Sequence, residues 1–334
     1  MKSKQTLSVA ESIRLDAIVT NLGLGKHWTG PEMVDEVVEK CEALVNPFVR
    51  GLAPKGEVLS TKLATHFHVK FEEVRCEQDV SALEDVYLRQ KREPGFLQLR
   101  DEILSPENDA LLFQRLHAKA EDPDRWVAVL NLLKTEDRAY WNRFHELSHR
   151  IAEPPQFILP FRRQRTDDRD AVEEVIDSVA GAIGFHRAIF DPLVAAIRDQ
   201  QLTFDQIAYI RNTYAPTASL LAVTNAVVKR WPRPALAFIA RMGGRLRREE
   251  SDVDLRVCPQ GRNACAKRAE LVLIPNMRVP KGSVVRAVFL SGQNQSALEN
   301  TGTWTTSDGG KLRAREVLIS AVRLGSRIYG LMSM

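Results

Sequence analysis

The chain contains 334 residues, 44% of them hydrophobic and 27% charged, and carries a formal net charge of +4 at pH 7. This composition supplies enough apolar side chains for two or three domains with cores of their own. The longest apolar run, 218–228, is interrupted by Thr224 and Asn225 and is far too short to cross a bilayer, which excludes a chain that spans a membrane as an apolar helix.

The cysteines and the first residues indicate the cellular compartment. The four cysteines are widely scattered and match neither a zinc-ribbon spacing nor the disulfide framework of a small secreted domain. The segment from Met1 to Gln5 leads into charged sequence and not into an apolar signal core. We therefore expect a cytoplasmic protein with reduced thiols and no membrane partner.

The first part of the chain is predicted to be helical. Periodic apolar residues favour helices over 8–22 and 31–49, with Thr29 as the N-cap of the second. Between them lies a glycine-containing loop, 23–26, which follows no strand and is therefore no nucleotide-binding signature.

A small sheet is expected to follow. Residues 65–74 are rich in β-branched and aromatic side chains, and residues 86–92 alternate between polar and apolar. The turn at 93–95, Glu-Pro-Gly, then leads into a third short segment, 96–100. Helical periodicity returns over 107–133.

The next helix carries the motif His145-Glu146-Leu147-Ser148-His149, which reads H-E-x-x-H. Histidines four residues apart lie on one face of a helix, where both imidazoles can hold the same Zn2+. Glu146, beside the first histidine, is then placed as the general base that takes a proton from the attacking water. The alternative is a solvated helix whose histidines make ordinary hydrogen bonds.

The surroundings of the motif support a helix. Thr135 is a suitable N-cap, and the acidic residues Glu136 and Asp137 fall in the first turn, where they complement the helix dipole. The helix is expected to end near Pro154, because proline disfavours helical geometry in the residue before it. One apolar face is expected, formed by Tyr140, Phe144, Leu147 and Ile151.

A third protein ligand is expected from a second helix, over 170–183. Its apolar stripe leaves Glu173 and Asp177 one turn apart on a neighbouring face. We predict Glu173 as the third zinc ligand, with Glu174 as the alternative if the register differs by one residue. Asp177 is predicted to orient one of the ligating histidines through its other ring nitrogen. The alternative is that all three carboxylates form a solvated acidic face.

These two motifs resemble the ImmA/IrrE metallopeptidase family over roughly residues 60 to 245. Members read R-F-T-x-x-H-E-x-x-H and then E-x-x-A-D/N-x-F-A-x-x-L-L-M-P. Here Trp141 and Asn142 replace the Phe and Thr, Ile176 and Val179 replace the Ala and Phe of the second motif, and 183–186 replaces the L-L-M-P end. The resemblance implies a zinc-dependent endopeptidase that cleaves helix-turn-helix repressors in stress or mobile-element responses.

Charge is distributed unevenly along the chain. Residues 201–334 contain 20 Lys and Arg against 9 Asp and Glu, a balance of +11, so that residues 1–200 carry −7 of the total of +4. A basic C-terminal half, with a local cluster at 241–248, suggests contact with nucleic acid. The alternative is that these side chains decorate a solvated surface.

The C-terminal half is expected to begin with helices and end with strands. Residues 203–231 are predicted as helix, turn near Pro216, and helix, with Thr203 as the first cap. The resemblance implies a helix-turn-helix-like module here, and the alternative is a plain helical hairpin that completes the peptidase fold. The segments that favour strands are 252–257, 270–274, 283–290 and 312–324, with a turn at 307–310.

Three further histidines have less specific surroundings. His66 and His68 would share one face of a strand, but no third ligand lies nearby in the sequence. His186 could approach the metal from the end of the second helix. We expect all three to be ordinary hydrogen-bonded or solvent-facing histidines, and no second oxyanion-stabilising residue can be assigned.

The sequence therefore predicts an α+β protein, mostly helical, with a zincin-like metallopeptidase domain, a small sheet and a β-rich, sensor-like C-terminal domain. The expected cofactor is Zn2+, bound by His145, His149 and Glu173, and the expected partner is a protein substrate. The rival hypothesis is a non-catalytic zinc-containing regulator that binds DNA or protein. The predicted parts are a helical segment over 1–60, the peptidase domain over 61–190, a helical segment over 191–250 and the β-rich domain over 251–334.

Overall fold

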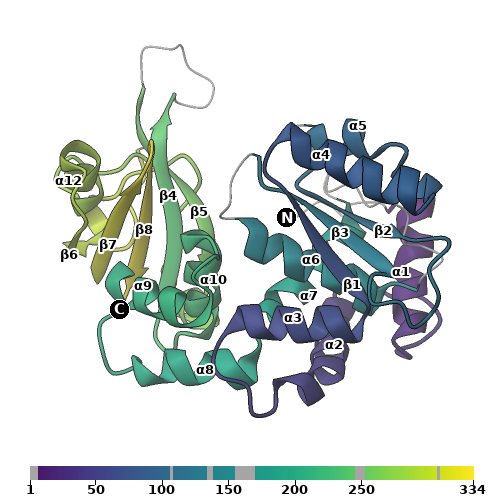
Figure 1. Ribbon diagram of the computed structural model, residues 1–334. Coiled ribbons are helices and arrows are strands. Elements are labelled where there is room, and N and C mark those ends of the chain that lie inside the picture. Colours follow the sequence, from purple (N-terminus) through teal and green to yellow (C-terminus); the bar gives the residue numbers. More distant parts are fainter. Residues whose placement is uncertain (1–6, 106–107, 134–137, 155–169, 245–252, 307–308) are drawn as a thin grey trace. The chain divides into compact units, whose positions relative to one another are not determined.

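The computed structural model describes residues 7–105, 108–133, 138–154, 170–244, 253–306 and 309–334 (Figure 1). The chain is a mixed α/β protein with two separate sheets, in agreement with the predicted α+β class. It forms two compact units. Unit 1 comprises Met1–Phe190 with Tyr214–Ser219, and unit 2 comprises Asp191–Thr213 with Leu220–Met334. The four-part division inferred from the sequence stays a prediction.

Unit 1 consists of a three-stranded sheet and the helices that pack on it. The strands are β1 (Val69–Val74), β2 (Ala110–Gln114) and β3 (Trp126–Asn131). The helices are α1 (Val9–Asn21), α2 (Met33–Val49), α3 (Gly56–His66), α4 (Glu77–Glu84), α5 (Leu99–Leu104), α6 (Ala139–Ala152) and α7 (Ala171–Gly184), with a π-helical turn η1 (Asp85–Gln90) and a 3-10 turn η2 (Pro94–Phe96).

The strand order is β1-β3-β2, with β1 parallel and β2 antiparallel to the central strand β3. β3 is buried on both faces. Val127 and Val129 pack into a cluster with α4 and α5 on one face, whereas Leu130 packs with Ala139 of α6 on the other. The sheet therefore supports α6, the helix that carries the H-E-x-x-H motif.

Several sequence-based expectations in this region are wrong. Residues 107–133 contain the strands β2 and β3 instead of a helix, because a strand buried on both faces shows no alternation and resembles a helical apolar run. Conversely, 86–92 falls mostly in η1, where Val86 and Leu88 pack beside buried Tyr87 on the same cluster. Residues 96–100 enter η2 and α5 and form no strand.

Two N-terminal boundaries also differ from the expectation. The helix α2 begins at Met33 with Glu32 in the capping position and no side-chain cap, so Thr29 is not its N-cap. Of the predicted strand at 65–74, the first residues still belong to α3, and only Val69–Val74 is extended. His66 therefore ends a helix while His68 lies in a left-handed turn with φ of 56°, and the two do not share a strand face.

Unit 2 is built on a five-stranded antiparallel sheet in the order β5-β4-β8-β7-β6. Its strands are β4 (Ala235–Gly243), β5 (Asp254–Arg262), β6 (Gln295–Asn300), β7 (Glu316–Leu324) and β8 (Arg327–Ser333). Its helices include α9 (Phe204–Tyr214), α10 (Leu220–Arg230), α11 (Ala264–Arg268) and α12 (Val284–Ser291), and α8 (Arg187–Ala196) crosses the boundary between the units.

The sequence predicted the β-rich character of this end but not every element. Residues 283–290 form α12 instead of a strand, and no strand occurs at 270–274. Gly330 of β8 faces Phe238 of β4, and a Cβ at Gly330 would lie 2.1 Å from the Phe238 ring, so only glycine lets the ring pack against the neighbouring strand.

The helical pair predicted over 203–231 is present as α9 and α10. The backbone N–H of Phe204, the first residue of α9, donates to Ser320 Oγ of β7, and α10 packs on β4 and β5. Both helices therefore contact the sheet of unit 2, while Tyr214 at the end of α9 belongs to unit 1 and donates to the carbonyl oxygen of Gly184. Whether the pair is a helix-turn-helix-like module or a plain hairpin stays a prediction. The cluster at 241–248 and the turn at 307–310 lie partly outside the described residues.

Among the described residues, no single helix is long and apolar enough to cross a membrane; α7 and α8 meet the test only together, as a pair bent by 63°.

Candidate metal centre

The helix α6 forms because one of its faces is continuously apolar. Tyr140, Phe144, Leu147 and Ile151 are all buried, with at most 5% of each side chain exposed. The helix begins after Arg138, and the predicted capping residues at 135–137 lie outside the described residues. It ends at Ala152, since Glu153 adopts the extended conformation that a following proline favours.

The helix α7 supplies the third candidate ligand. Its N-cap is Asp170, whose carboxylate accepts a hydrogen bond from the backbone N–H of Val172 at 2.8 Å. α7 packs along α6 and buries its apolar stripe there. This register leaves Glu173 facing the histidines of α6, whereas Glu174 is exposed.

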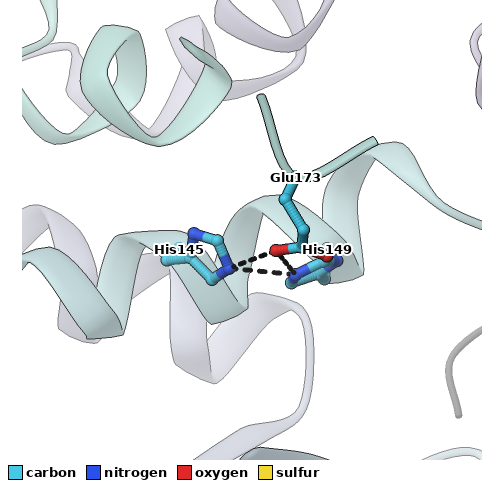
Figure 2. A group of neighbouring side chains, drawn as sticks. All are labelled: His145, His149 and Glu173. Atoms are coloured by element: carbon cyan, nitrogen blue, oxygen red, sulfur yellow. Dashed lines mark hydrogen bonds and ion pairs between the residues drawn. The ribbon is translucent and has the colours of Figure 1, made fainter. Parts of the chain in front are cut away.

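Three atoms converge between the two helices (Figure 2). Glu173 Oε2 lies 3.2 Å from His145 Nε2 and 3.6 Å from His149 Nε2, and the two Nε2 atoms are 3.1 Å apart. Both histidines are at least 98% buried. His145, His149 and Glu173 thus form a group that could hold a metal ion, with their donor atoms within 4.8 Å of one another.

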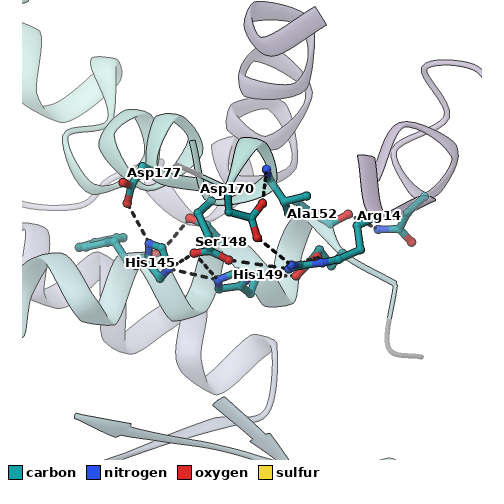
Figure 3. Close-up of polar contacts among 12 residues, drawn as sticks. Arg14, His145, Ser148, His149, Ala152, Asp170 and Asp177 are labelled. Carbon is teal, nitrogen blue, oxygen red and sulfur yellow. Dashed lines mark hydrogen bonds and ion pairs between the residues drawn. The ribbon is translucent and has the colours of Figure 1, made fainter. Parts of the chain in front are cut away.

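Each histidine is oriented by a carboxylate on its other ring nitrogen, and Figure 3 shows this contact for His145 and Asp177. His145 Nδ1 lies 3.0 Å from Asp177 Oδ1, the contact expected for Asp177. His149 Nδ1 lies 2.7 Å from Glu153 Oε2. With an Nδ1–H donating to each carboxylate, loss of the Nε2 protons on metal binding would direct both Nε2 lone pairs toward Glu173.

Sequence reasoning missed Glu153. The residue follows His149 by four positions and is 99% buried, although its own backbone has already left the helix. The pattern H-E-x-x-H-x-x-x-E was visible, since a carboxylate four residues after a histidine can reach its ring. Arg14 of α1, which pairs with Glu153 at 2.9 Å, had no such signal because it lies 139 residues away in the chain.

The charges in this cluster shift its pKa values strongly. Burial would lower the pKa of His149, but the negative charges of Glu173 and Glu153 outweigh it and raise the value to about 10. The pKa of His145 is raised against the same desolvation by its hydrogen bonds with Asp177 and Glu173. Burial would raise the pKa of Glu173, but the two histidines hold it well below its usual range.

The geometry of the cluster fits a cation. Two imidazole lone pairs and a carboxylate oxygen are all acceptors, and acceptors that meet in a buried space need positive charge between them. Protons supply that charge in the metal-free protein, which is why the histidine pKa values rise. A divalent ion that prefers nitrogen and oxygen donors fits the same place and satisfies all three atoms.

The remaining candidate residues are distributed differently. Glu146 is buried, 1% exposed, and lies on α6 about 100° around the helix from His145. His186 follows the far end of α7, which is roughly 16 Å along the helix axis from Glu173. Its Nδ1 accepts a hydrogen bond from the N–H of Ala188, so it serves the next helix turn and does not approach the metal-binding group.

A scan against protein-family models and a search of curated proteins each found no match to this chain.

Proposed function

We propose that this protein is a zinc-dependent endopeptidase of a zincin-like type. The observation that carries the proposal is the convergence of His145, His149 and Glu173 with each imidazole oriented by a buried or half-buried carboxylate. Two histidines and one carboxylate are a donor set that catalytic zinc uses, and three protein ligands leave one position open for water or substrate. A structural zinc site uses four protein ligands and leaves no such position.

Zinc bound there supplies Lewis-acid polarisation of the scissile carbonyl and makes water acidic enough to be deprotonated near neutral pH. Glu146 takes the proton of the attacking water and passes it to the leaving amine. Asp177 and Glu153 keep the Nδ1 protons in place, so that both imidazoles present Nε2 to the ion. Burial of the cluster excludes bulk water from these contacts.

The proposed substrate is a helix-turn-helix repressor, cut once in an exposed segment that can unfold locally. Support for this substrate class comes from the resemblance of the two motifs to the ImmA/IrrE family. A single cut that separates DNA binding from dimerisation inactivates a repressor irreversibly, which suits an inducible response.

The test combines metal content with cleavage. Wild-type protein is expected to bind one zinc and to cleave a repressor encoded near its own gene, with fragments mapped by mass spectrometry. Glu146→Gln should retain zinc and lose at least two orders of magnitude in cleavage rate, since amide cannot accept the proton. Glu77→Gln, at an exposed position in α4, is the matched control and should cleave normally.

The outcomes separate chemistry from substrate choice. Cleavage by Glu146→Gln at the wild-type rate would show that another group is the base. Stoichiometric zinc without cleavage of any repressor or unfolded protein would favour the rival, non-catalytic regulator. Zinc-dependent cutting of unrelated unfolded proteins, with neighbouring repressors intact, would reject the specific substrate and keep the reaction.

A further inference from the structure

The N-terminal helix α1 contacts both helices that carry the ligands. At its C-terminal end, Asn21 Nδ2 donates to the carbonyl oxygen of Ala152, the last residue of α6, at 2.9 Å. Near its start, Glu11 Oε1 accepts from the backbone N–H of Ala171, the first residue of α7, also at 2.9 Å. Terminal carbonyl and N–H groups of helices have no partner within their own helix. The helix α1 therefore supplies partners to one end of each ligand helix.

Arg14 lies between these two contacts and reaches into the metal-binding group (Figure 3). Its Nε and Nη2 donate to Glu153 Oε1 at 3.1 and 2.9 Å. The same guanidinium lies 3.5 Å from Asp170 Oδ2 and 3.8 Å from Glu173 Oε1. One side chain from α1 thus contacts the carboxylate that orients His149, the N-cap of α7 and a metal ligand.

The two oxygens of Glu153 have different partners. Oε1 accepts both bonds from Arg14, and Oε2 faces His149 Nδ1 at 2.7 Å. Two charge-assisted hydrogen bonds hold Oε1 in place, and Oε2 is left to contact the His149 ring. Because the Glu153 side chain is 1% exposed, its charge also needs a cation close by. Arg14 meets both needs.

We propose that Arg14 is a positioning residue of the metal centre. It holds Glu153 so that Glu153 can orient His149, and it steadies the first turn of α7 so that Glu173 faces both histidines. The helix α1 is accordingly part of the metal-binding unit. The inference rests on the proposed function only in requiring that zinc binds at His145, His149 and Glu173.

Positioning and simple electrostatics predict opposite results. Removing a positive charge 3.8 Å from a ligand oxygen would, by Coulomb attraction alone, tighten the binding of a divalent cation. Loss of a group that orients ligands weakens metal binding, by roughly 10- to 100-fold in comparable sites. The sign of the change in zinc affinity therefore decides between the two roles.

The experiment measures zinc affinity of the full-length chain by competition with a chromogenic chelator, and the visible spectrum of the cobalt-loaded protein. Arg14→Met is expected to bind zinc roughly 10- to 100-fold more weakly and to change the cobalt spectrum, which reports ligand geometry. Arg14→Lys keeps the charge without the two neighbouring N–H donors and should fall between Arg14→Met and wild type. It also serves if Arg14→Met does not fold.

Arg100→Met is the matched control. Arg100, also in unit 1, likewise makes two hydrogen bonds to one glutamate, at 3.2 and 2.7 Å to Oε1 and Oε2 of Glu84. Neither residue is among the contacts of the metal-binding group described above. This variant should lose some thermal stability and keep wild-type zinc affinity and cobalt spectrum.

A double-mutant cycle tests whether Arg14 acts through Glu153. Glu153→Gln alone should weaken zinc binding. The double variant Arg14→Met/Glu153→Gln should bind zinc less weakly than the product of the two single fold-changes predicts. Wild-type or tighter zinc binding by Arg14→Met would overturn the inference. If the two single fold-changes multiply fully in the double variant, Arg14 does not act through Glu153. If the wild-type protein itself binds no zinc, it is the proposed function that fails.

Discussion

The two units of this protein fill their interiors in contrasting ways. Along α6, unit 1 buries a polar series: Asn142, His145, Glu146, Ser148, His149 and, just beyond its end, Glu153. Unit 2 is organised around a large apolar cluster between its sheet and α12, in which Trp304, Phe238 and Met277 are almost completely buried. The apolar cluster of unit 2 is filled by side-chain packing, whereas the buried polar series of unit 1 includes a group that could hold a metal ion.

The difference assigns the candidate functional site to unit 1 and a purely apolar cluster to unit 2. Burying polar groups costs free energy unless each finds a partner, so a buried cluster of imidazoles and carboxylates marks a candidate functional site. Apolar packing in unit 2 depends on shape and volume and has no comparable need for an ion. We therefore expect changes in metal or protonation to act on unit 1, and changes in side-chain volume to act on unit 2.

The largest effect should come from removing the carboxylate ligand. Glu173→Ala is expected to weaken zinc binding roughly 1000-fold or more, about 4 kcal/mol, because one of three donors is lost. Glu174→Ala is the control from the same helical turn, and its exposed side chain should leave affinity unchanged. Metal content after dialysis and chelator competition measure both. Zinc lost from Glu174→Ala but retained in Glu173→Ala would show that the register is wrong by one residue.

Metal removal should distinguish the units within one sample. A ligand at 1000 times its dissociation constant stabilises the state that binds it by about 4 kcal/mol. Chelation is therefore expected to raise amide hydrogen exchange in α6 and α7 and to leave β4, β7 and β8 protected as before. Hydrogen exchange resolved by peptide and mass spectrometry makes the comparison. Equal loss of protection in both units would mean that the metal centre supports the whole chain.

A change of side-chain volume in unit 2 should lower the stability of that unit and leave zinc binding in unit 1 unchanged. Gly330→Ala places a Cβ 2.1 Å from the Phe238 ring, and overpacking of this kind costs about 1 to 3 kcal/mol of unfolding free energy. Gly282→Ala is the control in unit 2, since no atom lies within 4 Å of its added Cβ. Thermal denaturation should register the first change and not the second, with zinc affinity unchanged in both. Weaker zinc binding by Gly330→Ala would contradict the independence of the units.

The pH dependence of the metal-free protein is a further difference expected between the units. The pKa of His149 rises from 6.5 to about 10 on folding, so the folded state binds more protons between these values. The resulting stabilisation is complete below pH 6.5 and is lost as the pH rises toward 10. Denaturant unfolding of zinc-free protein should show this decline, and His149→Gln should remove most of it. Stability of unit 1 that increases with pH across this window would contradict the assignment.

Local patterns in the sequence were sufficient for the two ligand helices. His145 and His149 are four residues apart, and the apolar stripe of 170–183 leaves Glu173 and Asp177 on one neighbouring face. Such relations depend only on the geometry of a helix, so the sequence was enough to anticipate which side chains share a face. The same local periodicity gave a wrong prediction of a helix over β3, because a strand buried on both faces has no polar and apolar alternation.

What the sequence by itself determined, then, is the composition of the candidate metal-binding group and the α+β character of the chain. Only the tertiary structure decided how that group is held: Arg14 reaches Glu153 across 139 residues, and α1 meets one end of α6 and of α7. It also decided that β1 pairs with β3 and that Gly330 admits the ring of Phe238. Contacts between distant segments depend on how the whole chain packs, and no local period encodes them.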